Sequence, residues 1–276
     1  SGGGGSSTTS TASTTSTTSS TSSSSSDDGS GCSRPGARSS KEIWVGETSS
    51  TYGGGTANAS ASFVAGFMWL DKLALAARLN HSVVCRQVFG HASYSAVGYD
   101  NVPNPDYYSA LLWQRLVGRR VLKVEGGLAP NRDVRVYAFC AADQQQPAGG
   151  GAVTVVWLNT QNETRAALRF EFAKNGGDGG GGGGGGGGSG DSGGSSGGRV
   201  GGGGEQRVWA LTSLPGLPTS RAVYLNRDTL LAIDAESGAP VEMPPAIVPA
   251  GKEVVVAALS YGFVVLPGAG AEACRM

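Results

Sequence analysis

Residues 62–79 read SFVAGFMWLDKLALAARL, and the next apolar run, residues 81–88, reads HSVVCRQV. The first stretch has apolar side chains at helical spacing, which predicts an amphipathic helix. The second has the length and composition of a buried strand. Val64, Met68 and Leu75 widen the apolar stripe, so we expect the helix to be covered on two sides. The main apolar face is made of Phe63, Phe67, Leu70 and Ala74.

The segments on either side repeat the same order of elements. Residues 42–46 form a short apolar run that predicts a buried strand, and a polar loop follows at residues 48–61. A second loop, residues 90–104, leads into a second helix that begins at Pro105 and ends at Gly118. This order predicts a parallel α/β fold. Both loops are long for structural connections, and ligands bind on that side of a parallel sheet.

Beyond residue 118 the pattern changes to short apolar runs separated by turn residues, which predicts an all-β sandwich. We therefore place a domain boundary near residue 118, between residues 36–118 and residues 119–276. The runs are RRVLKVE (119–125), DVRVYAFC (133–140), AVTVVWLN (152–159), ALRFEFA (167–173), QRVWALTSL (206–214), AVYLN (222–226), EVVVAAL (253–259) and YGFVVL (261–266).

Two tracts of low complexity cannot contribute to a core. Residues 1–31 are almost all Ser, Thr and Gly, and residues 175–204 are almost all Gly. Neither has apolar groups whose burial could offset the entropy of ordering, so we expect residues 1–35 and 175–204 to be disordered. The second tract lies between two predicted strands and is therefore a loop insertion in the sandwich domain.

Charge and hydropathy exclude two broad classes of protein. The chain has 21 basic and 21 acidic residues, and a net charge of zero argues against a general nucleic-acid binder. No run reaches the roughly 18 continuous apolar residues of a membrane-spanning helix.

The four cysteines, Cys32, Cys85, Cys140 and Cys274, do not form the CxxC pairs of a zinc site. Cys140 closes a predicted strand and Cys274 lies near the end of the sequence. A disulfide between them would tie that end to a sheet, and two unrelated thiols are the alternative.

Glu47 stands alone at the end of the first predicted strand, where parallel α/β folds place catalytic groups. Tyr52 offers an aromatic face, and residues 53–55 are three glycines whose backbone N–H groups can bind anionic oxygens. A carboxylate nucleophile beside such a loop suits an acidic sugar. The alternative is a surface glutamate that happens to follow a strand.

Polar residues also end the second predicted strand. Arg86 and Gln87 follow its apolar run, and Tyr94 lies in the loop beyond. These side chains are candidates for hydrogen bonds to a polar substrate in the same cleft. The alternative is a strand end that meets solvent.

Five segments, in order and with similar spacing, resemble heparanase and the related plant and microbial β-glucuronidases, a family of retaining glycoside hydrolases. The resemblance covers residues 36–172 and, more loosely, residues 205–276. The segments are WVGETSSTYGGG (44–55), FVAGFMWLDKLALAARL (63–79), VVCRQVFG (83–90), PDYYSALLWQRLVGRRVL (105–122) and VRVYAFC (134–140).

The resemblance implies a (β/α)8 barrel with a β-sandwich beside it. Residues 36–118 would then hold the last two βα units of the barrel. Glu47 matches the nucleophile of a retaining mechanism that uses two carboxyl groups. The loop that holds the uronic acid is matched by Tyr52, Gly53 and Gly54, and cleft residues are matched by Gln87 and Tyr94.

The second carboxyl group, the acid/base, lies in an Asn-Glu-Pro motif in this family, and the chain has no such motif. Its Asn162-Glu163 pair lies in the predicted sandwich and does not qualify. We therefore expect a C-terminal fragment that needs the N-terminal part of the same protein and is inactive alone, because the leaving group lacks a proton donor.

The resemblance also implies a disulfide between Cys140 and Cys274, a buried thiol at Cys85 and a glycosylated Asn162. It implies no cofactor and no metal, and an acidic polysaccharide or glycoside as substrate. It further implies peripheral association with the cell surface and a secreted, extracellular, lysosomal or vacuolar location.

Three functions stay open at this point. The first is an endo-β-glucuronidase acting on heparan-sulfate-like polysaccharide, and the second is an exo-acting β-glucuronidase. The third is a non-catalytic carbohydrate-binding or adhesion module.

Overall fold

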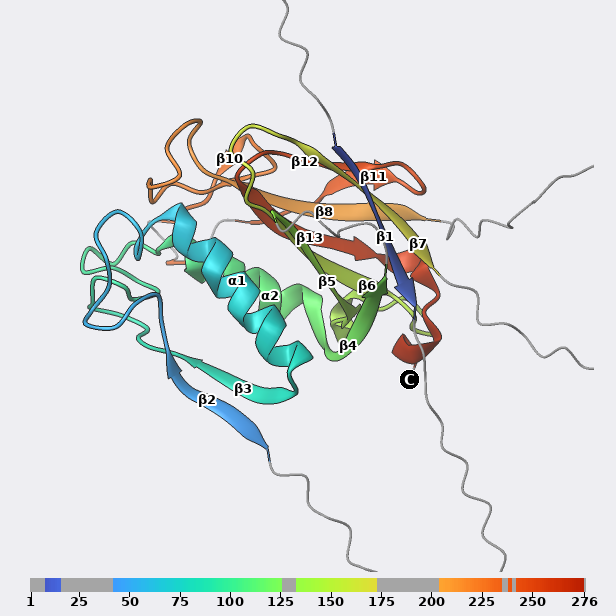
Figure 1. Ribbon diagram of the computed structural model, residues 1–276, viewed down its shortest axis with the longest axis horizontal. Coiled ribbons are helices and arrows are strands. Elements are labelled where there is room, and N and C mark those ends of the chain that lie inside the picture. Colours follow the sequence, from blue (N-terminus) through green and yellow to red (C-terminus); the bar gives the residue numbers. More distant parts are fainter. Residues whose placement is uncertain are drawn as a thin grey trace, which may run out of the picture.

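The computed structural model describes residues 8–15, 42–125, 133–172, 204–234, 238–239 and 242–275. Two helices lie between a small two-stranded sheet and a large sheet (Figure 1). Cys32 and the predicted disorder of residues 175–203 lie outside the described residues. No helix in the described ranges has the length and apolar character needed to cross a membrane.

The predicted strand–helix–strand–helix order is confirmed. Its elements are β2 (Ile43–Thr48), α1 (Phe63–Arg78), β3 (His81–Arg86) and α2 (Pro105–Leu116). Strands β2 and β3 are parallel, and Thr48 is paired with Arg86 at their carboxyl ends. The two long loops therefore start at the same edge of the small sheet.

The predicted burial of this unit is wrong in two places. Ile43 and Trp44 of β2 are 50% and 60% exposed, and Val64 and Leu75 of α1 are exposed as well. Among the described residues, β2 has a single strand neighbour, β3. Helix α1 contacts both β3 and the large sheet, as predicted, but Val64 and Leu75 lie outside these two contacts. A strand in a closed barrel has two neighbours, whereas β2 is paired on one side only in the part of the chain that the structure describes.

The predicted C-terminal boundary of the second helix also needs correction. Helix α2 ends at Leu116, because Val117 is already extended and begins the next strand. Gly118 is therefore not a helix cap. A Cβ on Gly118 would lie 2.6 Å from the carbonyl oxygen of Cys140, so glycine is needed there for close strand packing.

All eight apolar runs predicted as strands form strands. The structure adds three that the runs did not predict, β1, β10 and β11. The strands are β1 (Thr8–Thr15), β4 (Val117–Glu125), β5 (Val134–Ala141), β6 (Val153–Asn159), β7 (Ala166–Phe172), β8 (Glu205–Thr212), β9 (Tyr224–Leu225), β10 (Thr229–Leu230), β11 (Ala246–Pro249), β12 (Val254–Val256) and β13 (Ser260–Leu266).

These strands form one eleven-stranded sheet in the order β10-β9-β8-β13-β6-β5-β4-β1-β7-β12, with β11 paired to β8. Strand β1 is antiparallel to β4 and parallel to β7. For residues 8–15 the expected disorder is therefore wrong, since this run contains β-branched threonines and pairs with the edges of two strands. The predicted sandwich of two separate sheets is not confirmed, because β1 makes the hydrogen-bonded path continuous.

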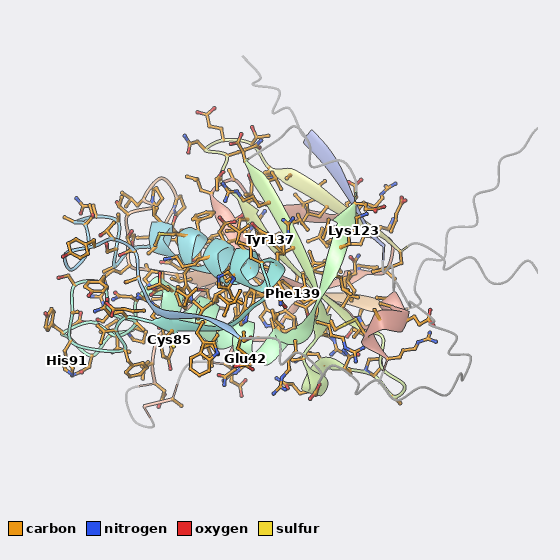
Figure 2. All side chains as sticks on the ribbon, turned by 60° about the horizontal axis from the view of Figure 1, so that its bottom comes forward. Glu42, Cys85, His91, Lys123, Tyr137 and Phe139 are labelled. Carbon is orange, nitrogen blue, oxygen red and sulfur yellow. A yellow bond between two sulfur atoms is a disulfide. The ribbon has the colours of Figure 1, made fainter. Side chains whose placement is uncertain are left out.

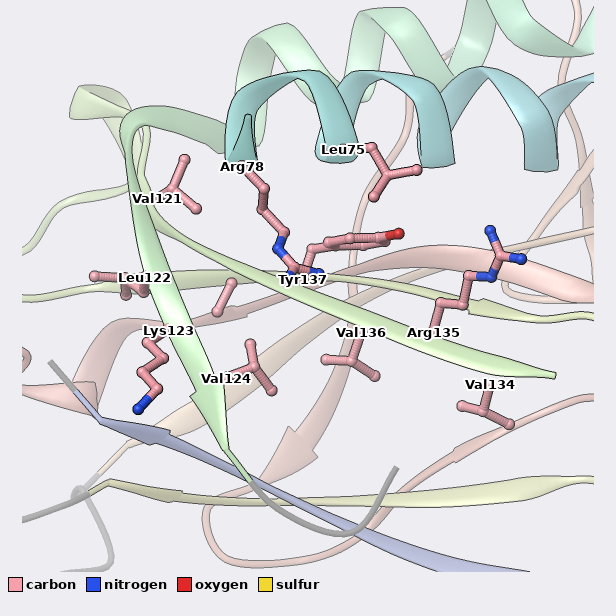
Figure 3. Close-up of a pocket in the computed structure, with 11 residues that line it drawn as sticks. Leu75, Arg78, Val121, Leu122, Lys123, Val124, Val134, Arg135, Val136 and Tyr137 are labelled. Carbon is pink, nitrogen blue, oxygen red and sulfur yellow. The ribbon is translucent and has the colours of Figure 1, made fainter. Parts of the chain in front are cut away.

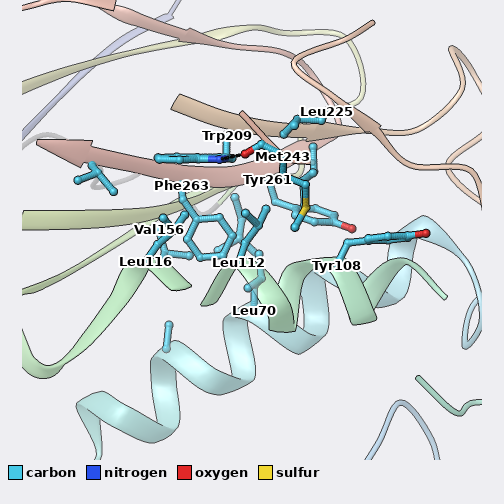
Figure 4. Packing of buried hydrophobic residues seen from close by; sticks show 14 of the residues in the cluster. Leu70, Tyr108, Leu112, Leu116, Val156, Trp209, Leu225, Met243, Tyr261 and Phe263 are labelled. Carbon is cyan, nitrogen blue, oxygen red and sulfur yellow. Dashed lines mark hydrogen bonds between the residues drawn. The ribbon is translucent and has the colours of Figure 1, made fainter. Parts of the chain in front are cut away.

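The central strands are buried on both faces. In β6, Val156 and Leu158 belong to one apolar cluster, whereas Val153, Val155 and Trp157 belong to another. Alternate residues of a strand point to opposite faces, so the sheet separates two cores. Helices α1 and α2 cover the first face, where Phe63 stacks on Tyr261 with ring centroids 4.5 Å apart. Figure 4 shows this packing, in which Leu70, Leu112, Val156, Trp209 and Phe263 meet.

Gly262 in β13 is a sensitive position of this core. A Cβ there would lie 2.0 Å from the carbonyl oxygen of Trp209 and 2.9 Å from its neighbour Trp157. Backbone on the paired strand must then move, so we expect Gly262→Ala to lower the free energy of unfolding by about 3 kcal/mol. Urea denaturation measures this loss. Gly46→Ala is the control, since a Cβ on that strand glycine meets nothing within 4 Å, and equal losses in both variants would contradict the packing argument.

Cys140 and Cys274 form a disulfide with their Cα atoms 5.2 Å apart. It joins the end of β5 to the short helical turn Glu272–Cys274. Cys85, by contrast, is exposed, so its predicted burial is wrong. Figure 2 labels Cys85 on the small sheet, where the described residues supply no layer over its side chain.

Candidate functional site

The candidate site lies at the carboxyl ends of β2 and β3. Glu47 is the last residue but one of β2, and its side chain is exposed. The backbone N–H of Gln87 donates a hydrogen bond to the carbonyl oxygen of Thr48 at 2.8 Å. Glu47 and Gln87 are therefore on adjacent strand ends, as expected from a parallel pair.

The loop after β2 is built by small residues. Gly53, Gly54 and Gly55 have φ values of 81°, 96° and 103°, a region that favours glycine. The loop is closed by Ser60, whose hydroxyl accepts hydrogen bonds from the Ser50 hydroxyl at 2.7 Å and from the backbone N–H of Thr56 at 2.6 Å. These contacts hold the glycine turn in the loop that follows Glu47.

Tyr94 lies against that turn. A Cβ on Gly54 would lie 3.8 Å from the ring of Tyr94, and one on Gly55 would lie 3.1 Å from its Cβ. The second loop therefore touches the first, and Tyr94 shares the site with the glycines. Tyr52 lies on the first loop, and its side chain is fully exposed.

Arg86 is the best-connected side chain of the site. Its Nη1 donates to the Ser49 hydroxyl and to the Gln87 carbonyl oxygen, both at 2.7 Å. Its Nη2 donates to the Tyr94 carbonyl oxygen at 2.6 Å and to the Asp106 carboxylate. Arg86 therefore differs from both sequence interpretations, because its side chain is mostly buried and its terminal nitrogens are already bonded within the protein.

Asp106, the partner of Arg86, was not predicted. It lies in the first turn of α2 and its side chain is 3% exposed, against 13% for Arg86. Burial raises the pKa of the Asp106 carboxyl, and the charge and hydrogen bond of Arg86 oppose that rise. Leaving either charge buried without the other is costly, so the pair holds together.

Lys72 forms a second connection that was not predicted. From the middle of α1, its Nζ donates to the Thr48 hydroxyl at 2.6 Å and to the Ser49 carbonyl oxygen at 2.7 Å. Burial lowers the pKa of the Lys72 ammonium group, and the nearby Arg86 charge lowers it further. Lys72 thus fixes the backbone that directly follows Glu47.

A cavity of about 680 Å³ lies away from this site, between the end of α1 and strands β4 and β5 (Figure 3). Arg78 reaches over the ring of Tyr137 there, with 5.8 Å between Cζ and the ring centroid. The Tyr137 hydroxyl donates to Asp71 at 2.6 Å, and Arg135 pairs with the same carboxylate. The charge of Arg135, which lines the cavity, is thus paired with Asp71. None of the predicted site residues lines this cavity.

Within the part of the chain that the structure describes, no three His, Cys, Asp or Glu side chains gather into a metal-binding group. Asn162 is exposed in the turn between β6 and β7, and its glycosylation stays a prediction.

Solved structures with the same fold are glycoside hydrolases. The α-L-arabinofuranosidase of family 51 from Thermotoga petrophila RKU-1 aligns with 82% of this chain and 43% of its own length, at a TM-score of 0.51 and 10% identity. The Thermotoga maritima α-L-arabinofuranosidase gives the same coverage and TM-score at 11% identity. The likeness is consistent with a partial (β/α)8 barrel. Both neighbours are glycoside hydrolases, and at this identity the likeness shows that this chain shares their fold.

Curated relatives define the family within that class. Chicken heparanase is 48% identical over 46% of this chain, and "Heparanase-like protein 1" of Arabidopsis thaliana is 31% identical over 84% of it. Baicalin-β-D-glucuronidase of Scutellaria baicalensis is 30% identical over 86%. No family model matches the chain. The chain belongs to the heparanase and β-glucuronidase family, and the match falls on the C-terminal portion of its members.

The chain spans less than half the length of these relatives. It covers 24% of chicken heparanase, 42% of the Arabidopsis protein and 38% of the Scutellaria enzyme.

Proposed function

We propose that this chain provides the nucleophile and the uronic-acid-binding loop of a retaining β-glucuronidase. The observation that carries the proposal is the position of Glu47, an exposed carboxylate at the end of a parallel strand that leads into the glycine turn touched by Tyr94. The names of the relatives, heparanase and β-glucuronidase, support a glucuronide substrate.

In the proposed first step, a carboxylate oxygen of Glu47 forms a bond to the anomeric carbon as the glycosidic bond breaks. Water then hydrolyses this ester and releases the sugar. The departing oxygen needs a proton from a second carboxyl group. We propose that this group lies on a residue outside these 276, since the chain has no Asn-Glu-Pro motif.

The glycine turn accounts for an acidic sugar. Gly53 is exposed and carries no side chain of its own, and Gly54 and Gly55 follow it in the same turn. Backbone N–H groups of such a turn bind carboxylates well. Tyr52, with its free aromatic face, would pack on the sugar ring, and Gln87 and Tyr94 would line the other side. The disulfide fits an oxidising compartment, and a secreted or lysosomal location is part of the proposal.

Heparan-sulfate-like polysaccharide is the first candidate substrate, because chicken heparanase has the higher identity, 48%. An exo-acting β-glucuronidase is the second candidate, favoured by the longer coverage of the Scutellaria enzyme, 86% of this chain.

The test is covalent labelling of the complete protein with 2-deoxy-2-fluoro-β-glucuronosyl fluoride. The Glu47 oxygen bonds to C1 while the C1–F bond breaks, and fluoride leaves without a proton, so the acid/base is not needed for this step. We expect a mass increase of one fluoroglucuronosyl group, mapped by peptide sequencing to Glu47. An unlabelled protein, or a label on another residue, would sink the proposed function.

A further inference from the structure

The Arg86 guanidinium group connects four segments of the chain. A guanidinium has four terminal N–H groups in a fixed plane, and each of the two terminal nitrogens of Arg86 has two acceptors. The acceptors are the Ser49 hydroxyl, the Gln87 and Tyr94 carbonyl oxygens, and the Asp106 carboxylate. The donor capacity of these nitrogens is therefore fully used.

The four acceptors belong to the elements that carry the candidate site. Ser49 follows Glu47 by two residues, Gln87 ends the neighbouring strand, and Tyr94 packs on the glycine turn. Asp106 stands on α2, which packs in the core. The bond from Arg86 to Asp106 therefore links the loops that follow β2 and β3 to helix α2.

The guanidinium is also held from the side. Its Cζ lies 5.3 Å from the ring centroid of Trp69, a side chain of α1 that is 5% exposed. Stacking of this kind and planar hydrogen bonding favour arginine over lysine. Arg86 therefore has one well-defined position between α1 and α2.

We propose that Arg86 is a positioning residue, which orients Glu47 relative to Gln87 and Tyr94 through its bonds to Ser49, the two carbonyl oxygens and Asp106. The inference rests on the proposed function, since it assigns a role in the attack by Glu47. A positioning role differs from a merely structural role, because loss of Arg86 should then lower the rate of that attack more than the stability of the fold.

The principal variant is Arg86→Lys in the complete protein, labelled with 2-deoxy-2-fluoro-β-glucuronosyl fluoride. Lysine keeps the charge beside Asp106, but its three N–H groups do not lie in a plane and cannot reach all four acceptors. We expect the maximal labelling rate constant to fall about 100-fold, the effect of an ångström-scale misplacement. The probe concentration for half-maximal rate and the thermal midpoint should change little.

A second variant distinguishes a loss of positioning from a loss of the fold. Arg86→Met with Asp106→Asn removes both buried charges together and leaves no unpaired carboxylate. We expect slow labelling and faster amide hydrogen exchange in residues 49–56 and 88–97, with protection of α1 and α2 retained.

The matched control is Arg221→Met. Arg221 also donates hydrogen bonds to a carboxylate, Asp100 at 2.7 Å, and to a carbonyl oxygen, Val102 at 2.9 Å. Both partners lie on the second loop, and this ion pair is exposed. Its labelling rate constant should equal that of the wild type. Wild-type rates in Arg86→Lys, or an equal loss in Arg221→Met, would overturn the positioning role alone. An unlabelled wild type would overturn it together with the proposed function.

Discussion

Glu47→Gln is expected to lose the covalent adduct completely and to reduce turnover of a β-glucuronide by roughly 10⁴-fold or more. A neutral amide oxygen is a poor nucleophile, and it cannot stabilise the positive charge that develops at the anomeric carbon. The substitution keeps the size of the side chain. Because Glu47 is exposed at a strand end, the fold should be unaffected.

The control for this experiment is Glu42→Gln. Glu42 is an exposed carboxylate that directly precedes the same strand and accepts a hydrogen bond from the Trp44 indole at 3.0 Å. It lies at the opposite end of β2 from the candidate site, so its variant should be labelled at the wild-type rate. Persistent labelling of Glu47→Gln at another carboxylate would disprove the nucleophile assignment, as would loss of labelling in both variants.

Most of the fold could be predicted from periodicity. The helical spacing at residues 62–79 and the short apolar runs after residue 118 correspond to α1 and to eight strands. Strand β10 has only two residues, which is too short for any period. Strand β1 has no apolar alternation, and its pairing depends on the edges of β4 and β7, which are distant in sequence.

The candidate site divides in the same way. Glu47 and the glycine turn follow from local rules, because strand ends and glycine runs are visible in one segment. The bonds of Arg86 to Asp106 and of Lys72 to Thr48 join residues 20 and 24 positions apart, and no local pattern specifies them. Two signals in the sequence mark these residues. Lys72 is a charged residue within an apolar helical stretch, and Asp106 opens a helix directly after proline.

Removing the disulfide with Cys140→Ala and Cys274→Ala is expected to lower the free energy of unfolding by roughly 3 to 5 kcal/mol. The two cysteines are 134 residues apart, and closing a long loop restricts the unfolded chain strongly. Urea denaturation should show a lower midpoint, and wild-type protein in reductant should match the variant.

Cys85→Ala is the control, because Cys85 is an exposed thiol outside the disulfide and its loss should change stability by less than about 0.5 kcal/mol. Hydrogen bonds also hold the C-terminal turn, from the Gly151 N–H to the Cys274 carbonyl oxygen at 3.1 Å and from the Ala271 N–H to the Gly151 carbonyl oxygen at 2.9 Å. If those bonds alone sufficed, the double variant would keep the wild-type midpoint. Such a result, or four free thiols in unfolded, unreduced wild type, would contradict a stabilising disulfide. A lower midpoint in the double variant, with an unchanged midpoint in Cys85→Ala, would show that the hydrogen bonds around Gly151 do not replace the covalent link between the C-terminal turn and β5.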